Sequence, residues 1–297
     1  MPVNSYIEYL KFQKRSSGHT VKSYETDLHQ FFAYTLNFYE TNDPAQISTA
    51  MIRGWIAGLV DEGMEPRSVV RKVSTLRSFY KYLLRLNKVS TNPLTRVVVP
   101  KVKKRLPVFI DETRMDNLFM EMEDTHDYNE VLKQAIMELF YATGMRLSEL
   151  VELKLNDYDH KQVKVLGKRS KERILPLTQS AVEAIEKYVE QRNKLKKVID
   201  TTHLFLLENG KKVYQKFVYR LVNTYLGQVT TEKKKSPHVL RHTFATHILN
   251  NGAQLNAVKE LLGHASLAAT QVYTHNTISK LINIHQKAHP LEKRKAG

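Results

Sequence analysis

Apolar residues in the first third of the chain recur with the period of amphipathic helices. They lie three or four residues apart from Val21 to Leu36 and again from Ser68 to Leu86, and a shorter helix is predicted from Ala50 to Val60. On the helix from Ser68 to Leu86, the face opposite the apolar residues is basic and carries Arg67, Arg71, Lys72, Arg77 and Lys81. Such a face is often only solvated. Because one sign of charge dominates it, contact with a phosphate backbone is an equally good interpretation.

A break with two prolines separates this helical part from the rest. Asn92 precedes Pro93, and a residue before proline is disfavoured in the helical conformation, so the third helix ends here. Residues 97–107 contain Pro100, Pro107 and a run of basic residues, which predicts an extended, stiff segment. We therefore expect a helical domain over residues 1–95, a basic linker over residues 96–107 and a second domain over residues 108–297.

The second part of the sequence mixes helices with a little sheet. An amphipathic helix from Val131 to Ala142 is followed by Gly144, which can end it in the left-handed conformation. The further predicted elements are a strand from Gln162 to Leu166, a turn over residues 167–171, a return strand from Arg173 to Leu177, a helix begun by Thr178 and ending near Leu195, a short strand from Leu204 to Leu207 ended by Asn209-Gly210, and helices from Gln215 onward. The predicted fold class is mainly α with a small β-sheet, a helical N-terminal domain being followed by a mixed α+β domain.

Two basic residues begin a helix near the C-terminus. Ser236 is a good N-cap residue, and Pro237 suits the first helical position. His238 and Arg241 then lie one turn apart on one face. A helix N-terminus is partially positive and has free backbone N–H groups, so this end is suited to bind an anion.

A histidine and a tyrosine follow the next predicted helix. That helix runs from Leu255 to Leu262 and is capped by Gly263, so His264 lies just beyond its end and Tyr273 on a further short helix. Cationic donors for phosphate oxygens and a hydroxyl that can attack phosphorus are the groups that phosphodiester cleavage needs. Taken singly, Tyr273 is more simply a core residue and His264 a helix-end residue. Their combination with Arg241 favours chemistry.

Composition narrows the class of protein. The chain has 297 residues, enough for two domains, and 42% of them are hydrophobic, as in folded proteins. A formal net charge of +16 favours a polyanionic partner such as DNA, RNA, a heparin-like polymer or a membrane surface. The sequence has no cysteine, which excludes disulfides, thiolate nucleophiles and cysteine-ligated zinc. With no signal peptide and no long apolar run, a cytoplasmic location is the expectation.

The pair His238 and His242 is also compatible with a metal site. No glutamate nearby completes a zinc-protease pattern, and Arg241 would repel a cation. We therefore expect neither a metal ion nor a cofactor.

Several blocks of the sequence closely resemble the tyrosine recombinases of the phage integrase family, and within that family the Xer type, which resolves chromosome dimers. The blocks are His238-Val239-Leu240-Arg241-His242-Thr243-Phe244-Ala245-Thr246, Leu261-Leu262-Gly263-His264, Tyr273-Thr274-His275, Ala142-Thr143-Gly144-Met145-Arg146-Leu147-Ser148-Glu149-Leu150 and Gly167-Lys168-Arg169-Ser170-Lys171-Glu172-Arg173. The linker and residues 76–80 resemble the DNA-clamping, SAM-like N-terminal domain of the family. The resemblance covers nearly the whole chain, and its one departure is Arg169, where a glycine is common.

The resemblance implies six catalytic residues, which are Arg146, Lys168, His238, Arg241, His264 and Tyr273. Arg146 and Arg241 would bind the non-bridging oxygens of the scissile phosphate, because a guanidinium matches phosphate geometry and keeps its charge. His264 would donate a further hydrogen bond to these oxygens. Glu149 would neutralise or orient a nearby arginine.

The remaining implied roles concern proton transfer and attack. Tyr273 would attack the phosphorus with His238 as its acid–base partner, and Lys168 would protonate the departing 5′ oxygen. The product would be a 3′-phosphotyrosyl link and a free 5′ hydroxyl. Because the link stores the energy of the phosphodiester bond, rejoining through a Holliday junction would need neither ATP nor a metal ion.

The resemblance also implies partners. They are a double-stranded DNA recombination site and, on it, a homo- or hetero-tetramer with a paralogous recombinase, placed at the nucleoid. The apolar tail from Ile278 to Pro290 would dock on a neighbouring subunit, although it could pack on its own domain. The alternatives are a mobile-element integrase of the same family, a type IB topoisomerase, and a catalytically silent architectural DNA-binding protein.

Overall fold

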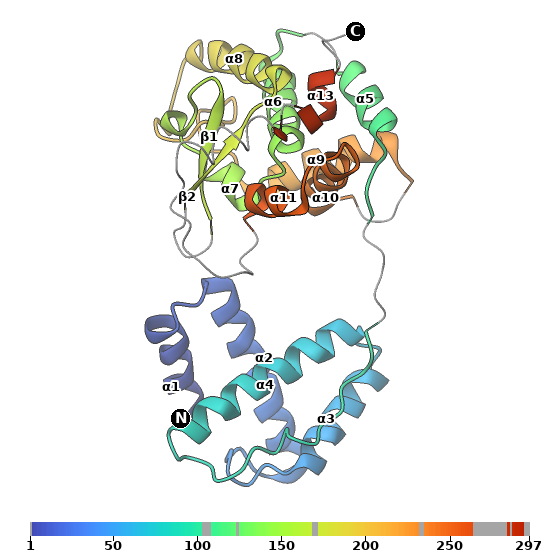
Figure 1. Cartoon of the computed structure of the whole chain (residues 1–297). Coiled ribbons are helices and arrows are strands. Elements are labelled where there is room, and N and C mark those ends of the chain that lie inside the picture. The colour runs from blue at the N-terminus through green and yellow to red at the C-terminus, as the bar shows by residue number, and fades with distance from the viewer. Residues whose placement is uncertain are drawn as a thin grey trace. The chain divides into compact units, whose positions relative to one another are not determined.

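The computed structural model of the chain describes residues 2–102, 108–122, 125–167, 172–231, 235–263, 284–285 and 287–293. The chain divides into two compact units, Met1–Arg105 and Leu106–Gly297 (Figure 1). Each unit has its own hydrophobic core. Within the described ranges, no helix has the length and apolar character needed to cross a membrane.

The first unit is a bundle of helices around an aromatic core. Its elements are α1 (Pro2–Glu8), the π-helical turn η1 (Tyr9–Gln13), α2 (Gly18–Tyr39), α3 (Thr49–Asp61) and α4 (Pro66–Arg85). Helix α4 packs against α1, α2 and α3 (Figure 1), and the rings of Phe31 and Trp55 meet edge to face with centroids 5.0 Å apart. The three predicted helices are confirmed, and most of the apolar residues that set their period lie in this core.

The basic face predicted on α4 is only partly a surface. Lys72 is 4% exposed, and its Nζ lies 3.1 Å from Oδ1 of the buried Asp27 on α2. Arg71 and Thr75 also donate to the Asp27 carboxylate. The prediction that Lys72 faces outward is therefore wrong, because a buried carboxylate draws this ammonium group inward. Arg67, Arg77 and Lys81 are exposed as predicted.

The start of the expected linker is packed on the first unit. Val97 is 6% exposed and belongs to its core, while the carbonyl of Val97 accepts a 3.1 Å hydrogen bond from Arg77. Arg53 donates to the carbonyl of Arg96 over 3.0 Å. Residues 103–107 of the expected linker lie outside the described residues.

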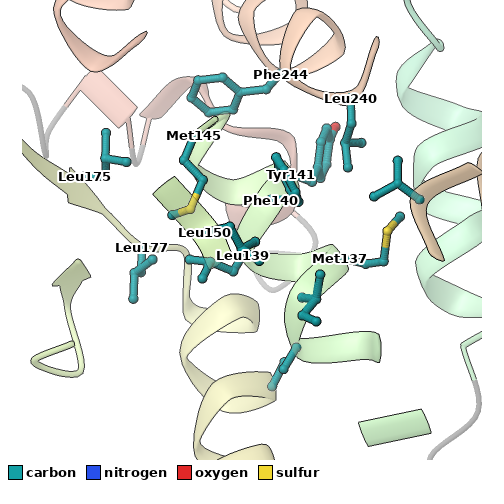
Figure 2. Close-up of a cluster of buried hydrophobic side chains, with 14 of the residues drawn as sticks. Met137, Leu139, Phe140, Tyr141, Met145, Leu150, Leu175, Leu177, Leu240 and Phe244 are labelled. Atoms are coloured by element: carbon teal, nitrogen blue, oxygen red, sulfur yellow. The ribbon is translucent and has the colours of Figure 1, made fainter. Parts of the chain in front are cut away.

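The second unit is built around helix α6 (Tyr128–Thr143), and its described residues include a single two-stranded sheet. Its elements are α5 (Glu112–Met120), α6 (Tyr128–Thr143), α7 (Leu147–Val151), the 3₁₀ turn η2 (Leu155–Asp157), β1 (Gln162–Leu166), β2 (Glu172–Pro176), α8 (Gln179–Asn193), α9 (Gln215–Val229), α10 (Pro237–Asn250), α11 (Leu255–Leu262) and α13 (Pro290–Lys293). Helix α6 packs against α8, α9 and α10. Figure 2 shows the core around the C-terminal end of α6, where Phe140 of α6, Met145 of the following turn and Phe244 of α10 come together.

Strands β1 and β2 form the predicted antiparallel hairpin, with Val163 opposite Leu175 and Val165 opposite Arg173. Thr178 caps α8 as predicted, by accepting from the backbone N–H of Ala181. Ser236 occupies the predicted N-cap of α10, but its hydroxyl accepts no capping hydrogen bond.

The short strand predicted from Leu204 to Leu207 is wrong. Leu206 forms only an isolated bridge with Lys212, closed by a turn in which Gly210 has φ +76° and donates to the carbonyl of Leu207 over 2.8 Å. The turn at Asn209 and Gly210 is thus confirmed. The run of apolar residues at these positions reflects burial, since Leu204, Phe205 and Leu206 are all buried in this unit.

The described part of the C-terminal tail is packed on its own unit. His285 and His289 are fully buried, and their Nε2 atoms lie 2.7 Å from the carbonyl oxygen of Ala142 and 3.1 Å from that of Tyr141. The last carbonyl groups of a helix have no partner within it. These two histidines therefore cap carbonyls in the last turn of α6, directly before the turn at Gly144.

Candidate active site

The turn after α6 carries the first arginine of the site. Gly144 has φ +57°, and a Cβ atom there would lie 2.3 Å from Cδ1 of Phe244, so both the backbone conformation and the space require glycine. The predicted left-handed cap is confirmed, since the N–H of Gly144 donates to the carbonyl of Phe140. Arg146 follows as the N-cap residue of α7.

Arg241 reaches the same turn from α10. It is 9% exposed, and its Nη1 and Nη2 donate over 2.6 Å each to the carbonyl oxygens of Gly144 and Leu262. Burial, and then the positive charge of Arg146, lower the pKa of Arg241 to about 10. The guanidinium therefore stays charged at neutral pH, close to a second cation and partly removed from water.

Arg146 is held by two partners. Its Nη1 donates over 2.7 Å to Oε1 of Glu149, and its Nη2 donates over 2.8 Å to the carbonyl of Gly263. The backbone N–H of Arg146 donates to the other oxygen of Glu149 over 2.7 Å. Its side chain is 24% exposed, so Arg146 is only partly removed from solvent.

Glu149 is buried between two arginines. Arg173 on β2 forks onto its carboxylate with two hydrogen bonds of 2.8 and 2.7 Å. Burial alone would raise the pKa of Glu149, but the hydrogen bonds from Arg173 and Arg146 outweigh it, and the pKa is lower than the ordinary value. The expectation that Glu149 neutralises or orients an arginine is confirmed.

Three guanidinium groups meet at the end of α11. Arg173, Arg241 and Arg146 donate in turn to the successive carbonyls of residues 261, 262 and 263. The C-terminal end of a helix is partially negative, which favours cations there. Glu149 supplies one negative charge against three positive ones, so the cluster has an unbalanced positive charge. Such an excess at a partly open site favours an anion.

The other predicted residues are placed only in part. His238 is exposed on α10, one turn before Arg241. His242 is half-buried, and burial lowers its pKa. Lys168, His264 and Tyr273 lie outside the described residues. Within the described ranges, no group of three or more histidine, aspartate or glutamate side chains is arranged to hold a metal ion.

Arg173 was not singled out from the sequence, although the strand pattern carried a signal. Arg173 lies two residues before Leu175 and four before Leu177, which are both buried. Side chains at this spacing lie on the same face of a strand, so Arg173 points inward with them. A charge on the inward face of a strand needs a buried partner. That partner, Glu149, lies in a different motif of the sequence.

Two family models match the chain. Residues 109–280 match the phage integrase family, and residues 3–87 match the N-terminal SAM-like domain of phage integrases. The chain therefore belongs to the phage integrase family. It is a tyrosine recombinase, a site-specific enzyme that cuts and rejoins DNA.

Curated relatives indicate the branch of the family. The chain is 40% identical to tyrosine recombinase XerC of Thermodesulfovibrio yellowstonii, with 98% of this chain and 97% of the relative covered. It is 36% identical to tyrosine recombinase XerD of Listeria monocytogenes, over 97% of this chain and 98% of that one. Among solved structures, XerH bound to a palindromic difH substrate after cleavage has a TM-score of 0.69 at 18% identity, covering 97% of this chain and 81% of that one, and shares the fold.

Proposed function

We propose that this chain exchanges strands between two copies of a double-stranded DNA site, with Tyr273 as the nucleophile. One observation supports this most directly: Arg146 and Arg241 lie together and donate to adjacent carbonyls, those of Gly263 and Leu262. Each guanidinium has five N–H donors, and within the described part of the chain two of them are engaged. We assign the other donors to the phosphate. Two positioned arginines stabilise the charge that grows on the phosphoryl oxygens in the transition state.

We assign the remaining steps to residues near this cluster in sequence. His264 directly follows Gly263, whose carbonyl Arg146 holds, and we assign it a hydrogen bond to the same phosphoryl oxygens. His238 accepts the proton of the Tyr273 hydroxyl, whose ordinary pKa near 10 otherwise keeps it protonated. Lys168 protonates the departing 5′ oxygen. The phosphorus keeps its bond to the 3′ oxygen and is now bonded to the tyrosine oxygen in place of the 5′ oxygen. A 5′ hydroxyl from another strand then attacks this link, displaces the tyrosine and restores a phosphodiester.

The biological setting we propose is resolution of chromosome dimers by a tetramer on two DNA sites, formed by this chain alone or with a paralogue. Similarity to proteins named XerC and XerD over nearly their whole length supports it. The net charge of +16 supports DNA as the partner, because neutralised phosphates release counterions. Binding should therefore weaken steeply as salt concentration rises, and a shallow dependence would argue against this mode of binding.

Covalent trapping tests the assignment of the nucleophile. A library of nicked fragments from the host genome is incubated with the protein, and the DNA that becomes covalently attached is sequenced. We expect one short site to be enriched, and we expect Tyr273→Phe to abolish the adduct while DNA binding survives. Tyr219→Phe, at an exposed tyrosine of α9, is the control and should leave the adduct unchanged.

Each other outcome of this experiment identifies an error. An adduct that persists in Tyr273→Phe would show that another residue attacks. Adducts without sequence preference, together with relaxation of supercoiled DNA, would favour a topoisomerase. Binding without any adduct in the wild type would favour an architectural protein, and attachment at the ends of a mobile element would favour an integrase.

A further inference from the structure

We propose that Arg173 is a positioning residue for strand cleavage, which fixes Arg146, the arginine assigned to the scissile phosphate, through Glu149 and the carbonyl of Gly263, the two described groups that hold its side chain. The inference rests on the proposed function, because it assigns Arg173 a part in the same reaction. Arg173 itself does not need to reach the DNA. Its side chain is 5% exposed, and all three of its nitrogen atoms donate to protein acceptors.

The first connection runs through Glu149. The carboxylate accepts two hydrogen bonds from Arg173, and its Oε1 also accepts from Nη1 of Arg146. A carboxylate held by a fork of two parallel bonds is fixed in both position and plane. Without the fork, the hydrogen bonds that remain on the carboxylate of Glu149 among the described residues come from Arg146 itself, through its backbone N–H and Nη1. The pair then has no fixed guanidinium behind it, and Arg146 can shift together with Glu149.

The second connection runs through the end of α11. The Nε of Arg173 donates over 2.9 Å to the carbonyl of Leu261, and the next carbonyl but one, that of Gly263, accepts from Nη2 of Arg146. A Cβ atom at Gly263 would lie 3.2 Å from Cζ of Arg173, which shows how closely this turn packs on the guanidinium. Both acceptors of the Arg146 side chain in the described structure, Glu149 and the carbonyl of Gly263, are therefore linked to Arg173.

Arg241 depends on Arg173 much less. One of its two acceptors, the carbonyl of Gly144, belongs to the turn after α6 and has no hydrogen bond to Arg173. Only its other acceptor, the carbonyl of Leu262, lies on the segment that Arg173 holds. A change at Arg173 should therefore displace Arg146 more than Arg241.

The position of Arg173 in the sheet extends this connection to the hairpin. Arg173 is the second residue of β2 and pairs with Val165 on β1, while Lys168 lies in the segment that joins the two strands. The same side chain thus ties the base of the hairpin to the end of α11, directly before His264. Lysine cannot replace it, because one ammonium group cannot make three bonds in a single plane to two separate elements.

The experiment measures cleavage and binding separately. Single-turnover formation of the covalent adduct is followed at saturating protein on a nicked substrate that the wild type cleaves, and the Kd for DNA is measured in parallel. For Arg173→Lys we expect adduct formation to slow by about 10²-fold, the loss typical of a slightly misplaced group, with Kd changed by less than about twofold. Adduct formation by Arg173→Ala should recover in part when methylguanidinium is added.

A matched control separates positioning from general stability. Arg192 on α8 is also buried, 5% exposed, and donates to the carbonyl of His203 within the same unit. Arg192→Lys should lower the melting temperature as Arg173→Lys does but leave the rate of adduct formation at the wild-type value. Equal slowing in both variants would show that only folding is affected and would overturn the inference.

Double variants test the route through Arg146. Because Arg173 acts through Arg146, Arg173→Lys should add little to the loss caused by Arg146→Lys, whereas its effect should multiply with that of Arg241→Lys. Independent, multiplicative effects with Arg146→Lys would contradict the inference, as would a folded Arg173→Lys variant that cleaves at the wild-type rate. If the wild type itself forms no adduct at Tyr273, the proposed function fails instead, so the two failures are distinguishable.

Discussion

Each unit of the chain contains one buried carboxylate that binds two basic side chains, but the surroundings of the two carboxylates differ. In the first unit, Asp27 on α2 binds Arg71 and Lys72 of α4. In the second unit, Glu149 binds Arg146 and Arg173. Both acids are almost inaccessible to water, with side-chain exposures of 1% and 3%.

The two groups differ in two respects: the second has a third cation, and its arginines have backbone acceptors besides the carboxylate. Thr75 completes the Asp27 group, whereas Arg241 stands beside the Glu149 group and brings a further positive charge. In the second unit, the arginines also donate hydrogen bonds to backbone carbonyls at the end of α11, in addition to those that Glu149 accepts. A buried carboxylate with its cations can serve structure alone. In the second unit, three positioned arginines surround one carboxylate, and one of them, Arg146, is partly exposed. This arrangement favours binding of an anion, which distinguishes the candidate active site from a structural ion pair.

Loss of one surplus arginine should have the largest effect. We expect Arg241→Lys and Arg146→Lys each to slow adduct formation about 10²–10³-fold, because lysine cannot reproduce the guanidinium fork on phosphate. Arg71→Lys, in the first unit, should leave the rate unchanged once DNA is saturating. The measurement is single-turnover cleavage of a nicked substrate. A strong effect of Arg71→Lys on the rate would remove the contrast between the two groups.

Neutralising each carboxylate sharpens the comparison. Glu149→Gln and Asp27→Asn should each lower the free energy of unfolding by about 3–5 kcal/mol, since each leaves buried cations without their counter-charge. Only Glu149→Gln should also slow cleavage by the remaining folded protein, because Glu149 orients Arg146, to which we assign the scissile phosphate. Urea unfolding and single-turnover cleavage at a temperature well below the transition check both parts. Equal cleavage rates in the two variants would contradict the account.

A change at the glycine turn should have a smaller effect on stability. Gly144→Ala meets the ring of Phe244 and displaces the carbonyl that accepts from Arg241, so we expect a loss of about 2–4 kcal/mol and slower cleavage. Gly63 also has a positive φ, +78°, but open space around it. Gly63→Ala should therefore cost only about 1 kcal/mol and leave cleavage unaffected. Thermal unfolding and the cleavage assay would measure these differences.

The smallest expected effect is on the pH dependence of stability. Because the folded protein lowers the pKa of Glu149, its contribution to stability is complete above the ordinary glutamate pKa and is lost as pH falls through the lower, folded value. Glu149→Gln should flatten the fall in stability in this acidic range. Unfolding free energies measured across that range test it. An unchanged slope would show that Glu149 is not held in its charged form.

Local features of this fold were predictable from the sequence, and contacts between distant segments were not. Gly144 and Gly263 were recognised as helix ends because a left-handed cap depends on a few neighbouring residues. Lys72 was misplaced because the partner that buries it, Asp27, lies 45 residues away, and no periodicity of α4 reports on it. The strand predicted at Leu204 failed for a related reason, since a short apolar run indicates burial without specifying a strand partner.

The candidate site shows the same limit. The meeting of Arg146 with Arg241 was implied only by resemblance, because their separation along the chain carries no geometric information. Arg173 was overlooked because its role depends on Glu149 and on the end of α11, which come together only in three dimensions.

One measurement tests the central claim most directly: cleavage of a substrate whose scissile phosphate is replaced by a neutral methylphosphonate. If Arg146 and Arg241 together neutralise the charge of this phosphate, removing one oxygen charge makes one arginine dispensable. The account predicts that Arg241→Ala, severely slowed on the phosphate, is impaired at least ~10-fold less relative to the wild type on the methylphosphonate. Equal impairment on both substrates would contradict the claim that these arginines bind the scissile phosphate.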